Sequence, residues 1–303
     1  MFTRPFLKWV GGKRQLLPVL RRFYPETGGR YFEPFLGSGA VFFDLAARGF
    51  INGHGAVQSD ANPDLIGCYR RVRQSKDDVL ARLEILAADH KTRGRDCYIE
   101  VRDQRFNPMR AAWYAGGADL DDYSIEMAAM MIYLNRTGFN GLFRVNASGE
   151  YNVPPGRYEK PRIVDRVGLA FATAMFSFAN VHLEHAPYTH VLERAHAGDF
   201  VYFDPPYAPL SRTANFRSYT GRLFGDDDHQ VLQQMVIALA QRGVHVLLSN
   251  STAPIVRRLY ENNPDAVAAG IAAWRIPARR SVNSHAGRRG TIDELVVSNR
   301  RPH

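Results

Sequence analysis

Short apolar runs recur along the chain, and the segments between them carry hydrophobic residues at helical spacing. The runs lie at residues 31–33, 56–58, 181–184, 200–203, 244–250 and 292–297, and the helical patterns lie at 15–23, 40–48, 127–134 and 226–242. Short β-favouring runs are typical of buried strands, and the 3.6-residue period is typical of amphipathic helices. The alternation predicts an α/β fold whose sheet carries helices on both faces.

A glycine turn joins the first strand to the first long helix. The sequence YFEPFLGSG at residues 31–39 is followed by the helical stretch 40–48, which together make the first half of a Rossmann-like unit. The turn lacks the third glycine of the dinucleotide fingerprint, which disfavours NAD. Asp60 ends the next strand about 20 residues further on, where a carboxylate can accept both hydroxyls of a ribose. We therefore expect a nucleoside-bearing ligand at this edge of the sheet.

The motif Asp204-Pro205-Pro206-Tyr207 follows the apolar strand at 200–203, so its carboxylate falls at the carboxyl edge of the sheet. Neither proline has an N–H, and the backbone after Asp204 therefore offers acceptors without competing donors. Such a pocket suits a planar amine: Asp204 accepts one N–H, the Pro205 carbonyl accepts the other, and the Tyr207 ring stacks on the base. Asp-Pro is also a common turn opener, so this motif alone leaves a structural role open.

The N-terminal segment adds a second candidate site. Residues 6–13 (FLKWVGGK) combine a tight Gly-Gly turn with the cation of Lys13. A P-loop is disfavoured, because Lys13 is followed by Arg14 and the GxxxxGK[ST] spacing is missing. Taken alone, the segment is also compatible with an ordinary turn.

A charged helical region at about 65–122 precedes a predicted β-hairpin, in which strands 142–145 and 150–153 flank an Asn-Ala-Ser-Gly turn. A two-stranded ribbon can enter the major groove of DNA, where Arg144 can form a bidentate pair with guanine. Leu142 and Pro154 can contact a thymine methyl group. A plain structural hairpin remains the alternative.

Composition favours a polyanionic partner. The 303 residues carry a net charge of +9 and a pI of about 9.7, and the tail from Arg275 holds seven arginines against two acidic residues. No apolar run reaches the roughly 18 residues of a membrane span. The longest candidate, 167–181, is expected to be a buried helix. An N-terminus without an apolar signal region points to a cytoplasmic location.

The cysteines and histidines narrow the range of reactions and metal sites that the sequence supports. Cys68 and Cys97 are isolated thiols, which indicates a reducing compartment with neither a disulfide framework nor a zinc site. Neither follows a proline, which disfavours the nucleophilic cysteine of cytosine C5 methylation. The histidines at 182, 185 and 190 match no metal motif, so no metal is expected.

Two polar loops are further candidates. We expect residues 208–224 to form a lid over the bound base, because a long polar loop after a catalytic strand is more often functional than idle. The basic glycine-bearing loop at 287–290 is interpreted as a phosphate contact, with a solvated loop as the alternative.

Six collinear motifs together resemble one family. They are FLKWVGGK, YFEPFLGSG, SDANPD, NRTGFNGLFRVN with GEYNVPPGRY, DPPYAPLSRTANF and RRSVNSHAGRRGTIDEL. In order and content they resemble the Dam-type (D12 class, alpha group) DNA adenine-N6 methyltransferases. The resemblance runs from Phe6 to about Val297, and it is weakest at 65–122, which looks longer than usual for the family.

The resemblance implies S-adenosyl-L-methionine as methyl donor. Trp9, Lys13, Asp60 and Asp204 match the family's cofactor positions, with Phe35, Gly37 and Gly39 in the turn beside them. Asp204, Pro205, Pro206 and Tyr207 match the catalytic motif, whose aspartate points to adenine rather than cytosine N4. Phe139, Asn140, Leu142, Arg144 and Pro154 match recognition positions that read GATC. Two departures are noted: Phe139 replaces a frequent tyrosine, and Phe143 is bulkier than the usual residue.

The implied fold is a Rossmann-like S-adenosylmethionine-dependent methyltransferase sheet of seven strands with an inserted helical and β-hairpin target-recognition domain. We expect a discontinuous catalytic domain (1–66 and 160–303), a target-recognition domain (67–159), and a monomer acting on an adenine flipped out of double-stranded DNA. Two alternatives stay open. One is a non-catalytic DNA-binding protein on the same scaffold, and the other is a methyltransferase acting on RNA or a protein amide.

Overall fold

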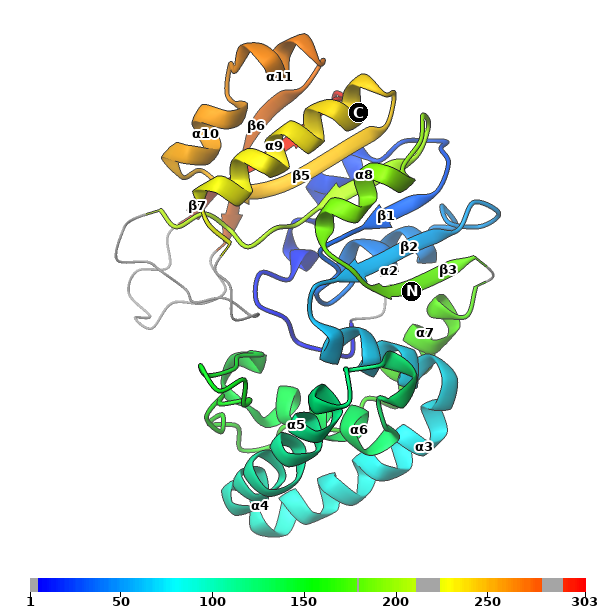
Figure 1. The fold of residues 1–303 in the computed structure, drawn as a ribbon, viewed down its shortest axis with the longest axis vertical. Helices are drawn as coiled ribbons and strands as arrows, with labels where there is room; N and C mark the ends of the chain where they lie inside the picture. Colours follow the sequence, from blue (N-terminus) through cyan, green and yellow to red (C-terminus); the bar gives the residue numbers. More distant parts are fainter. Residues whose placement is uncertain (1–4, 179, 211–223, 280–290) are drawn as a thin grey trace.

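A seven-stranded sheet forms the centre of the molecule (Figure 1). The computed structural model describes residues 5–178, 180–210, 224–279 and 291–303. The strands are β1 (Tyr31–Glu33), β2 (Ala56–Asp60), β3 (Val181–His185), β4 (Phe200–Phe203), β5 (His245–Ser251), β6 (Ala272–Arg279) and β7 (Thr291–Ser298). Their order is β3-β2-β1-β4-β5-β7-β6. Strands β1 to β5 run parallel to one another, and β7 lies between β5 and β6 and is antiparallel to both.

The direction in which successive strands are added to the sheet reverses beside β1, which makes a topological switch point. Tyr31 lies beside Ala56 of β2 on one side and beside Phe200 of β4 on the other. The connections leaving β1 and β4 therefore diverge, which opens a crevice at the carboxyl ends of these strands. Asp60 and Asp204 both fall at this edge.

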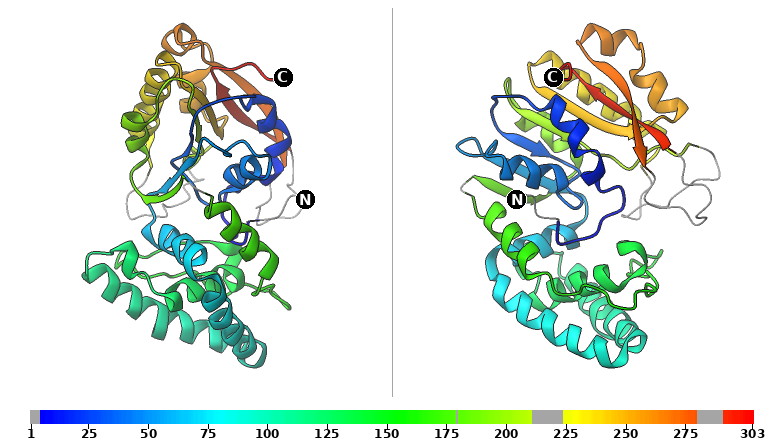
Figure 2. Two further views of the ribbon diagram at one scale, coloured as in Figure 1. Left: turned by 90° about the vertical axis from the view of Figure 1, so that its right-hand side faces the viewer. Right: turned by 180° about the vertical axis from the view of Figure 1, so that it is seen from behind.

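Helices cover both faces of the sheet (Figures 1 and 2). They are η1 (Lys13–Gln15), α1 (Leu17–Leu20), η2 (Arg21–Phe23), α2 (Ala40–Ala47), α7 (Arg166–Phe176), η6 (Tyr188–His190), α8 (Val191–Arg194), α9 (Asp226–Gln241), α10 (Pro254–Tyr260) and α11 (Pro264–Ala268). Side chains of α1, α2 and α7 pack on one face, and those of α8, α9 and α10 pack on the other. Alternate strand residues such as Tyr202 and Phe203 enter opposite cores, as the two-residue period of a strand requires.

A helical lobe extends below the sheet in Figure 1. It contains α3 (Pro63–Arg93), α4 (Arg95–Glu100), the π-helical turn η3 (Val101–Phe106), α5 (Asn107–Ala115), η4 (Leu120–Asp122), α6 (Ile125–Thr137) and η5 (Phe139–Gly141). Helix α3 starts at Pro63 after Asn62, whose side chain caps Leu65 N at 3.3 Å, and it kinks at Ser75. Helix α6 starts after Ser124, which caps Met127 N at 3.1 Å.

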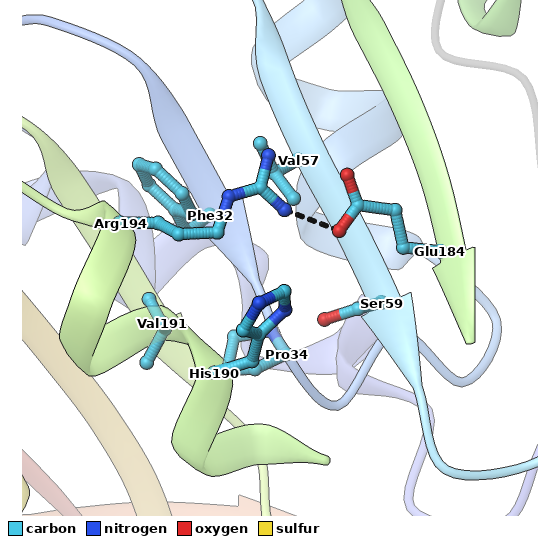
Figure 3. Close-up of a pocket in the computed structure, with 8 residues that line it drawn as sticks. All are labelled: Phe32, Pro34, Val57, Ser59, Glu184, His190, Val191 and Arg194. Atoms are coloured by element: carbon cyan, nitrogen blue, oxygen red, sulfur yellow. Dashed lines mark hydrogen bonds and ion pairs between the residues drawn. The ribbon is translucent and has the colours of Figure 1, made fainter. Parts of the chain in front are cut away.

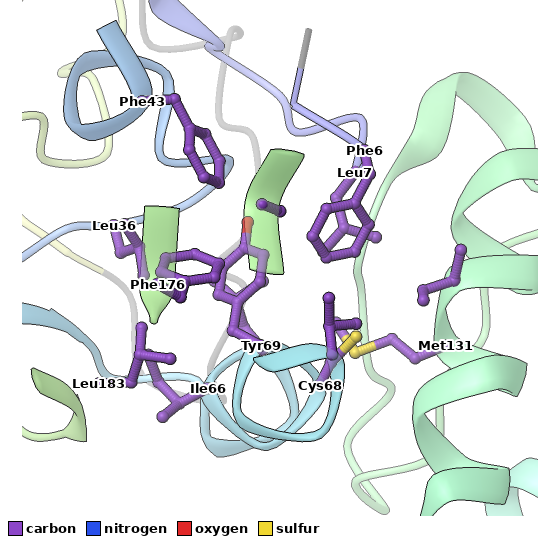
Figure 4. Packing of buried hydrophobic residues seen from close by; sticks show 14 of the residues in the cluster. Phe6, Leu7, Leu36, Phe43, Ile66, Cys68, Tyr69, Met131, Phe176 and Leu183 are labelled. Atoms are coloured by element: carbon purple, nitrogen blue, oxygen red, sulfur yellow. The ribbon is translucent and has the colours of Figure 1, made fainter. Parts of the chain in front are cut away.

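The lobe and the sheet share one hydrophobic core. Phe6, Tyr69 and Met131 lie together where α3 and α6 approach the sheet (Figure 4). The rings of Phe6 and Tyr69 meet edge to face at 5.5 Å. Burial is therefore continuous across the junction of the two parts.

Most predicted elements are found, and two predictions need correction. The predicted strand 200–203 coincides with β4, whereas strands 142–145 and 150–153 are not formed as a ladder: Val145 and Tyr151 make an isolated antiparallel bridge. The helix in 167–181 is not wholly buried, because Val167 is 64% exposed. The lid at 208–224 and the loop at 287–290 lie largely or wholly outside the described residues.

The described residues also bear on the cysteines, on membrane spans and on metal-ligating clusters. Cys68 and Cys97 are free and buried, and burial raises the pKa of both thiols. Within the described ranges, no helix is long and apolar enough to cross a membrane, and no cluster of three metal-ligating side chains occurs.

Candidate active site and recognition surface

Asp204 stands at the end of β4, and two side chains fix one of its oxygens. Lys13 Nζ lies 2.7 Å from Asp204 Oδ1, and Ser249 Oγ donates to the same atom at 3.2 Å. Lys13 is buried, whereas the Asp204 side chain is 20% exposed. Among the described residues, these interactions leave Oδ2 without a partner.

Burial and the neighbouring charged side chains together determine the pKa of Asp204. Burial raises the pKa of Asp204, and the Lys13 ammonium opposes that shift. Glu294, on the neighbouring part of β7, raises the pKa further by charge repulsion. A carboxylate in this setting is a strong hydrogen-bond acceptor, because few water molecules compete for it.

The Tyr207 ring is held from two sides. Its hydroxyl donates to Glu294 Oε2 at 2.6 Å, and Lys13 Nζ lies 4.5 Å from the centre of the ring. Of the two intervening prolines, Pro205 is buried and Pro206 is exposed. The four-residue motif therefore presents a carboxylate and an aromatic face in a fixed relation.

A second buried carboxylate supports the floor of the site. Glu33, the last residue of β1, accepts hydrogen bonds from Tyr31 Oη and Phe42 N, both at 2.9 Å. Burial raises its pKa well above the usual range, although both hydrogen bonds oppose that shift. Glu33 thereby ties β1 to the start of α2, directly beneath the glycine turn.

That turn requires glycine for steric reasons. Gly37 has a φ of +48°, and a Cβ at this position would lie 2.8 Å from Trp9 Cδ1. Tyr69 Oη donates to the Gly37 carbonyl at 2.7 Å, which fixes the turn from the side of α3. The next glycine, Gly39, has a φ of +68° and precedes the first residue of α2.

Asp60 closes the turn from the end of β2. Its two oxygens accept from Gly37 N at 3.0 Å and from Asn62 N at 2.9 Å. Burial raises the pKa of Asp60 to about 6, while the backbone amides of Gly37 and Asn62 oppose the shift. Each oxygen keeps a second lone pair, so the carboxylate can still accept from ligand hydroxyls.

Aromatic side chains border the same edge. Phe35, between β1 and the glycine turn, stacks on Tyr188 with ring centres 5.2 Å apart. Phe224 meets the Phe35 ring edge to face at 5.9 Å. A flat apolar wall of this kind suits the base of a nucleoside ligand.

The residues matched to cofactor positions lie in two groups. Lys13 contacts both Asp204 and the Tyr207 ring of the catalytic motif, and Trp9 packs over the Gly37 turn that Asp60 closes. A turn that allows close approach of the backbone, a carboxylate that can accept from hydroxyls and an aromatic wall together suit a nucleoside-bearing ligand.

Sequence reasoning missed Ser249 and Glu294. Both lie on apolar strands whose local pattern predicts only burial. They reach Asp204 and Tyr207 because β5 and β7 follow β4 in the sheet. The sequence TIDEL at 291–295 was noted only as part of a family motif.

A small cavity lies on the α8 side of the sheet (Figure 3), the side on which Phe35 and Tyr188 also pack. It lies between β1, β2 and α8, and the ion pair of Glu184 with Arg194 lies along it. Its volume of about 10 Å³ suits a single water molecule. It is too small for a cofactor.

The recognition residues predicted from the sequence gather on the helical lobe. Phe139 is 46% exposed, Asn140 is exposed with a φ of +54°, and Pro154 is exposed. Leu142 is half-buried, and the exposed Arg144 donates to Asn152 Oδ1 at 2.8 Å and to the Asn152 carbonyl at 3.1 Å. We call the segment 139–158 the recognition ribbon.

The recognition ribbon is held by one helical face instead of by a strand ladder. Tyr98 and Arg102 donate to the Val153 carbonyl at 2.9 and 3.0 Å. Asn107 exchanges two hydrogen bonds with the backbone of Tyr151, at 2.9 and 3.1 Å. The π-helical turn at 101–106 adds a residue to the period, which is why positions 102 and 107 face the same way.

An N-terminal segment links the recognition ribbon to the glycine turn. Asn135 bonds both backbone atoms of Lys8, accepting from its N–H at 2.8 Å and donating to its carbonyl at 2.7 Å. The next residue, Trp9, stacks on Phe143 of the recognition ribbon at 6.1 Å while covering Gly37. The bulk of Phe143, noted from the sequence, is thus used in packing.

Comparison with known proteins gives a family match over most of the chain. A model of the family described as D12 class N6 adenine-specific DNA methyltransferase matches residues 9–274. The chain is 36% identical to Type II methyltransferase M1.LlaDCHI of Lactococcus lactis subsp. cremoris, covering 98% of this chain and 95% of the relative. It is 36% identical to Type II methyltransferase M.MjaIII of Methanocaldococcus jannaschii, covering 99% and 100%.

A further relative is the DNA adenine methylase of Escherichia coli strain K12, 34% identical over 97% of this chain and 95% of the relative. Among solved structures, the rRNA methyltransferase aviRa from Streptomyces viridochromogenes matches with a TM-score of 0.31 and 13% identity, over 95% of this chain and 83% of that one. The chain belongs to the family of D12 class N6 adenine-specific DNA methyltransferases.

Proposed function

We propose that this enzyme flips an adenine out of double-stranded DNA, within the sequence GATC, and methylates its N6 nitrogen. The observation that carries the proposal is the state of Asp204 at the switch point of the sheet. Its Oδ1 is anchored by Lys13 and Ser249, and no described residue occupies Oδ2, which would accept from an incoming amine. A base inside a duplex cannot reach this recess, so the target has to leave the stack.

The chain's own groups would prepare the amine for reaction. Asp204 Oδ2 and the Pro205 carbonyl would accept the two hydrogens of N6, which localises the nitrogen lone pair. The Tyr207 ring, held by Glu294, would stack on the adenine. S-adenosyl-L-methionine bound beside Asp60 and Gly37 would supply an activated methyl group. Because that group is already reactive, positioning would provide most of the acceleration.

We assign sequence recognition to the ribbon and its supporting helices. Arg144 would read a guanine in the major groove, and Leu142 and Pro154 would contact a thymine methyl. In the structure, hydrogen bonds to Asn152 hold the Arg144 side chain in place. On DNA binding, Arg144 would exchange these bonds for contacts to the base. We propose residues 67–159 as the recognition domain and 1–66 with 160–303 as the catalytic domain of a monomer.

Two rival functions make different predictions. A methyltransferase for RNA or a protein glutamine would transfer label to those polymers instead of duplex DNA. A non-catalytic DNA-binding protein would bind no S-adenosyl-L-methionine in calorimetry. Exposure of Arg144, Phe139 and Pro154 favours duplex DNA over RNA or a protein glutamine. The Lys13–Asp204 pair and the turn that Asp60 closes favour an enzyme over a non-catalytic protein.

Expression in a host free of adenine methylation tests the proposal. Mapping of N6-methyladenine across the host genome reports activity, target base and recognition sequence together. We expect modified adenines in GATC alone, and far fewer of them with the Asp204→Ala variant. Modification spread over unrelated sequences would refute GATC, and wild-type levels of modification with Asp204→Ala would refute the catalytic role.

A further inference from the structure

The turn that follows Asp204 lacks backbone hydrogen bonds. Pro205 and Pro206 have no N–H, and among the described residues no backbone–backbone hydrogen bond involves residues 205–208. Pro205 and Ala208 are nevertheless buried. The shape of the turn therefore depends on side chains from neighbouring elements.

The last residues of β5 bond the far end of this turn. Asn250 Oδ1 accepts from the Ala208 N–H at 3.1 Å, and Ser251 Oγ donates to the Ala208 carbonyl at 2.6 Å. The Ser251 N–H also donates to Asn250 Oδ1, at 2.8 Å, which fixes the amide. Asn250 and Ser251 are both buried. We call Ser249, Asn250 and Ser251 the β5 clamp, because together they contact both ends of the turn.

The near end of the turn is reached through a chain of two hydroxyls. Tyr202 Oη lies 2.8 Å from Ser249 Oγ, which donates to Asp204 Oδ1 at 3.2 Å. A serine hydroxyl has one hydrogen, so a serine that donates to a carboxylate has to accept its other bond from the tyrosine. Burial raises the pKa of Tyr202 well above its usual range, so the phenol keeps its hydrogen. The chain therefore runs from the core to the carboxylate, and its two bonds strengthen each other in surroundings that exclude water.

Two donors from different elements converge on Asp204 Oδ1. Lys13 lies at the start of η1, and Ser249 lies on β5. Two such contacts restrict rotation of the carboxylate about its Cβ–Cγ bond, and so they fix the direction of Oδ2. Ser298 on β7 offers a contrast: it is also buried, and it donates to the Val246 carbonyl at 2.7 Å, a contact between strands alone.

We propose that the β5 clamp positions the catalytic motif for methyl transfer. Ser249, with its hydroxyl oriented by Tyr202, sets the direction of the Asp204 carboxylate. Asn250 and Ser251 hold the far end of the turn, and with it the position of the stacking ring. The inference rests on the proposed function, because it assumes that Asp204 accepts from the reacting amine. The clamp residues do not have to touch the base, so their loss misplaces the acceptor and lowers the rate without removing a ligand contact.

Serine variants test the near end of the turn. Ser249→Ala should lower kcat for methyl transfer by about tenfold to a hundredfold, with the Kd values for S-adenosyl-L-methionine and for duplex DNA unchanged. Ser249→Thr keeps the hydroxyl and should recover most of the rate. Ser298→Ala is the matched control, because it also removes one buried hydroxyl from the sheet, and it should retain the wild-type rate. Urea unfolding of each preparation confirms that folded proteins are compared.

The pH profile separates positioning from a merely structural role. Burial raises the pKa of Asp204, Lys13 and Ser249 oppose that shift, and Glu294 adds to it. Transfer needs the carboxylate, so activity falls as the pH drops through this pKa. Without the Ser249 hydroxyl the pKa rises, and the acidic limb of the kcat profile should move to higher pH in Ser249→Ala. The limb should stay in place in Ser298→Ala.

Ser251→Ala tests the far end of the turn. It removes the bond to the Ala208 carbonyl and should lower kcat while the same two Kd values stay unchanged. A wild-type rate in Ser249→Ala or Ser251→Ala, an unmoved acidic limb in Ser249→Ala, or a loss of ligand binding in proportion to the loss of rate would overturn the inference alone. A wild-type rate in Asp204→Ala would overturn the proposed function as well.

Discussion

Replacing Arg110 with methionine would leave the Asp64 carboxylate buried without its cation. Arg110 Nε donates to Asp64 Oδ2 at 2.8 Å, and Tyr114 Oη donates to the same oxygen at 3.0 Å. Asp64 is fully buried, the Arg110 side chain is 10% exposed, and Asp64 Oδ1 has no hydrogen-bond partner among the described residues. The pair joins the start of α3, close to Asp60, to the middle of α5.

The expected loss of folding stability follows from the burial of this ion pair. Removing one partner of a buried ion pair lowers the free energy of unfolding by about 3–5 kcal/mol, because the remaining charge is uncompensated. Arg110→Met should therefore lower the free energy of unfolding by roughly that amount in urea titrations. The double variant Asp64→Asn/Arg110→Met removes the stranded charge and should recover most of the loss. This coupling is what a double-mutant cycle isolates.

The same variant has a pH signature. Burial raises the pKa of Asp64, and Arg110 opposes that shift. Without Arg110, the folded-state pKa lies still further above its unfolded value, so the folded state binds more protons. The loss in Arg110→Met should then shrink as the pH falls through the folded-state pKa of Asp64 and the carboxyl becomes neutral. A loss below about 1 kcal/mol, or a double variant no more stable than the single, would refute the reasoning.

Recognition should change together with stability. Arg110 also donates to the Gly149 carbonyl in the turn of the recognition ribbon. Loss of that bond frees the turn beside Arg144, so discrimination among one-base site variants should weaken in Arg110→Met. Equal discrimination in the wild-type and variant proteins would show that the turn is held without Arg110.

Three further predictions concern single side chains. Glu294→Ala removes the 2.6 Å bond that holds Tyr207, and it should lower kcat in methyl-transfer assays while leaving the Kd for S-adenosyl-L-methionine nearly unchanged; an equal loss in both would assign Glu294 to folding. Arg144→Ala should cost roughly 1–3 kcal/mol of discrimination at one guanine, measured as the ratio of kcat/KM values between sites; an unchanged ratio would remove it from base reading. Because burial raises the pKa of Asp60 to about 6, cofactor affinity should fall as the pH drops below that value and should stay flat in Asp60→Asn; parallel curves for the two proteins in calorimetry would contradict the role of Asp60.

Local sequence patterns were sufficient for the central strand and its motif. Residues 200–203 are apolar and Asp204-Pro205 must end a strand, so β4 and the carboxylate at its end follow from short-range chemistry. The glycine turn and Asp60 were also predicted, because steric demands at Gly37 and Gly39 act within a few residues.

Contacts between distant segments could not be predicted in the same way. The ion pair of Lys13 with Asp204 depends on where the N-terminal segment crosses the sheet, and Ser249 and Glu294 depend on the order of β4, β5 and β7. No local pattern encodes either. Arg110 lies in the charged helical region at 65–122, and its burial against Asp64 becomes visible only after α3 and α5 pack.

The predicted hairpin is formed only next to its turn. Backbone hydrogen bonds from Asn152 N to the Arg144 carbonyl and from Asn146 N to the Glu150 carbonyl flank the single bridge of Val145 with Tyr151. The backbone groups of Tyr151 and Val153 that face away from this partner segment are bonded by the side chains of Tyr98, Arg102 and Asn107. Their alignment depends on a π-helical turn, which a search for the 3.6-residue period does not detect.

The most direct test of the account is single-turnover methyl transfer to duplex DNA by Asp204→Ala, with binding of cofactor and DNA measured on the same preparation. Loss of one preorganised acceptor predicts a fall in rate on the order of a hundredfold to a thousandfold or more, while both ligands still bind. Transfer at the wild-type rate would contradict the claim that this carboxylate holds the reacting amine.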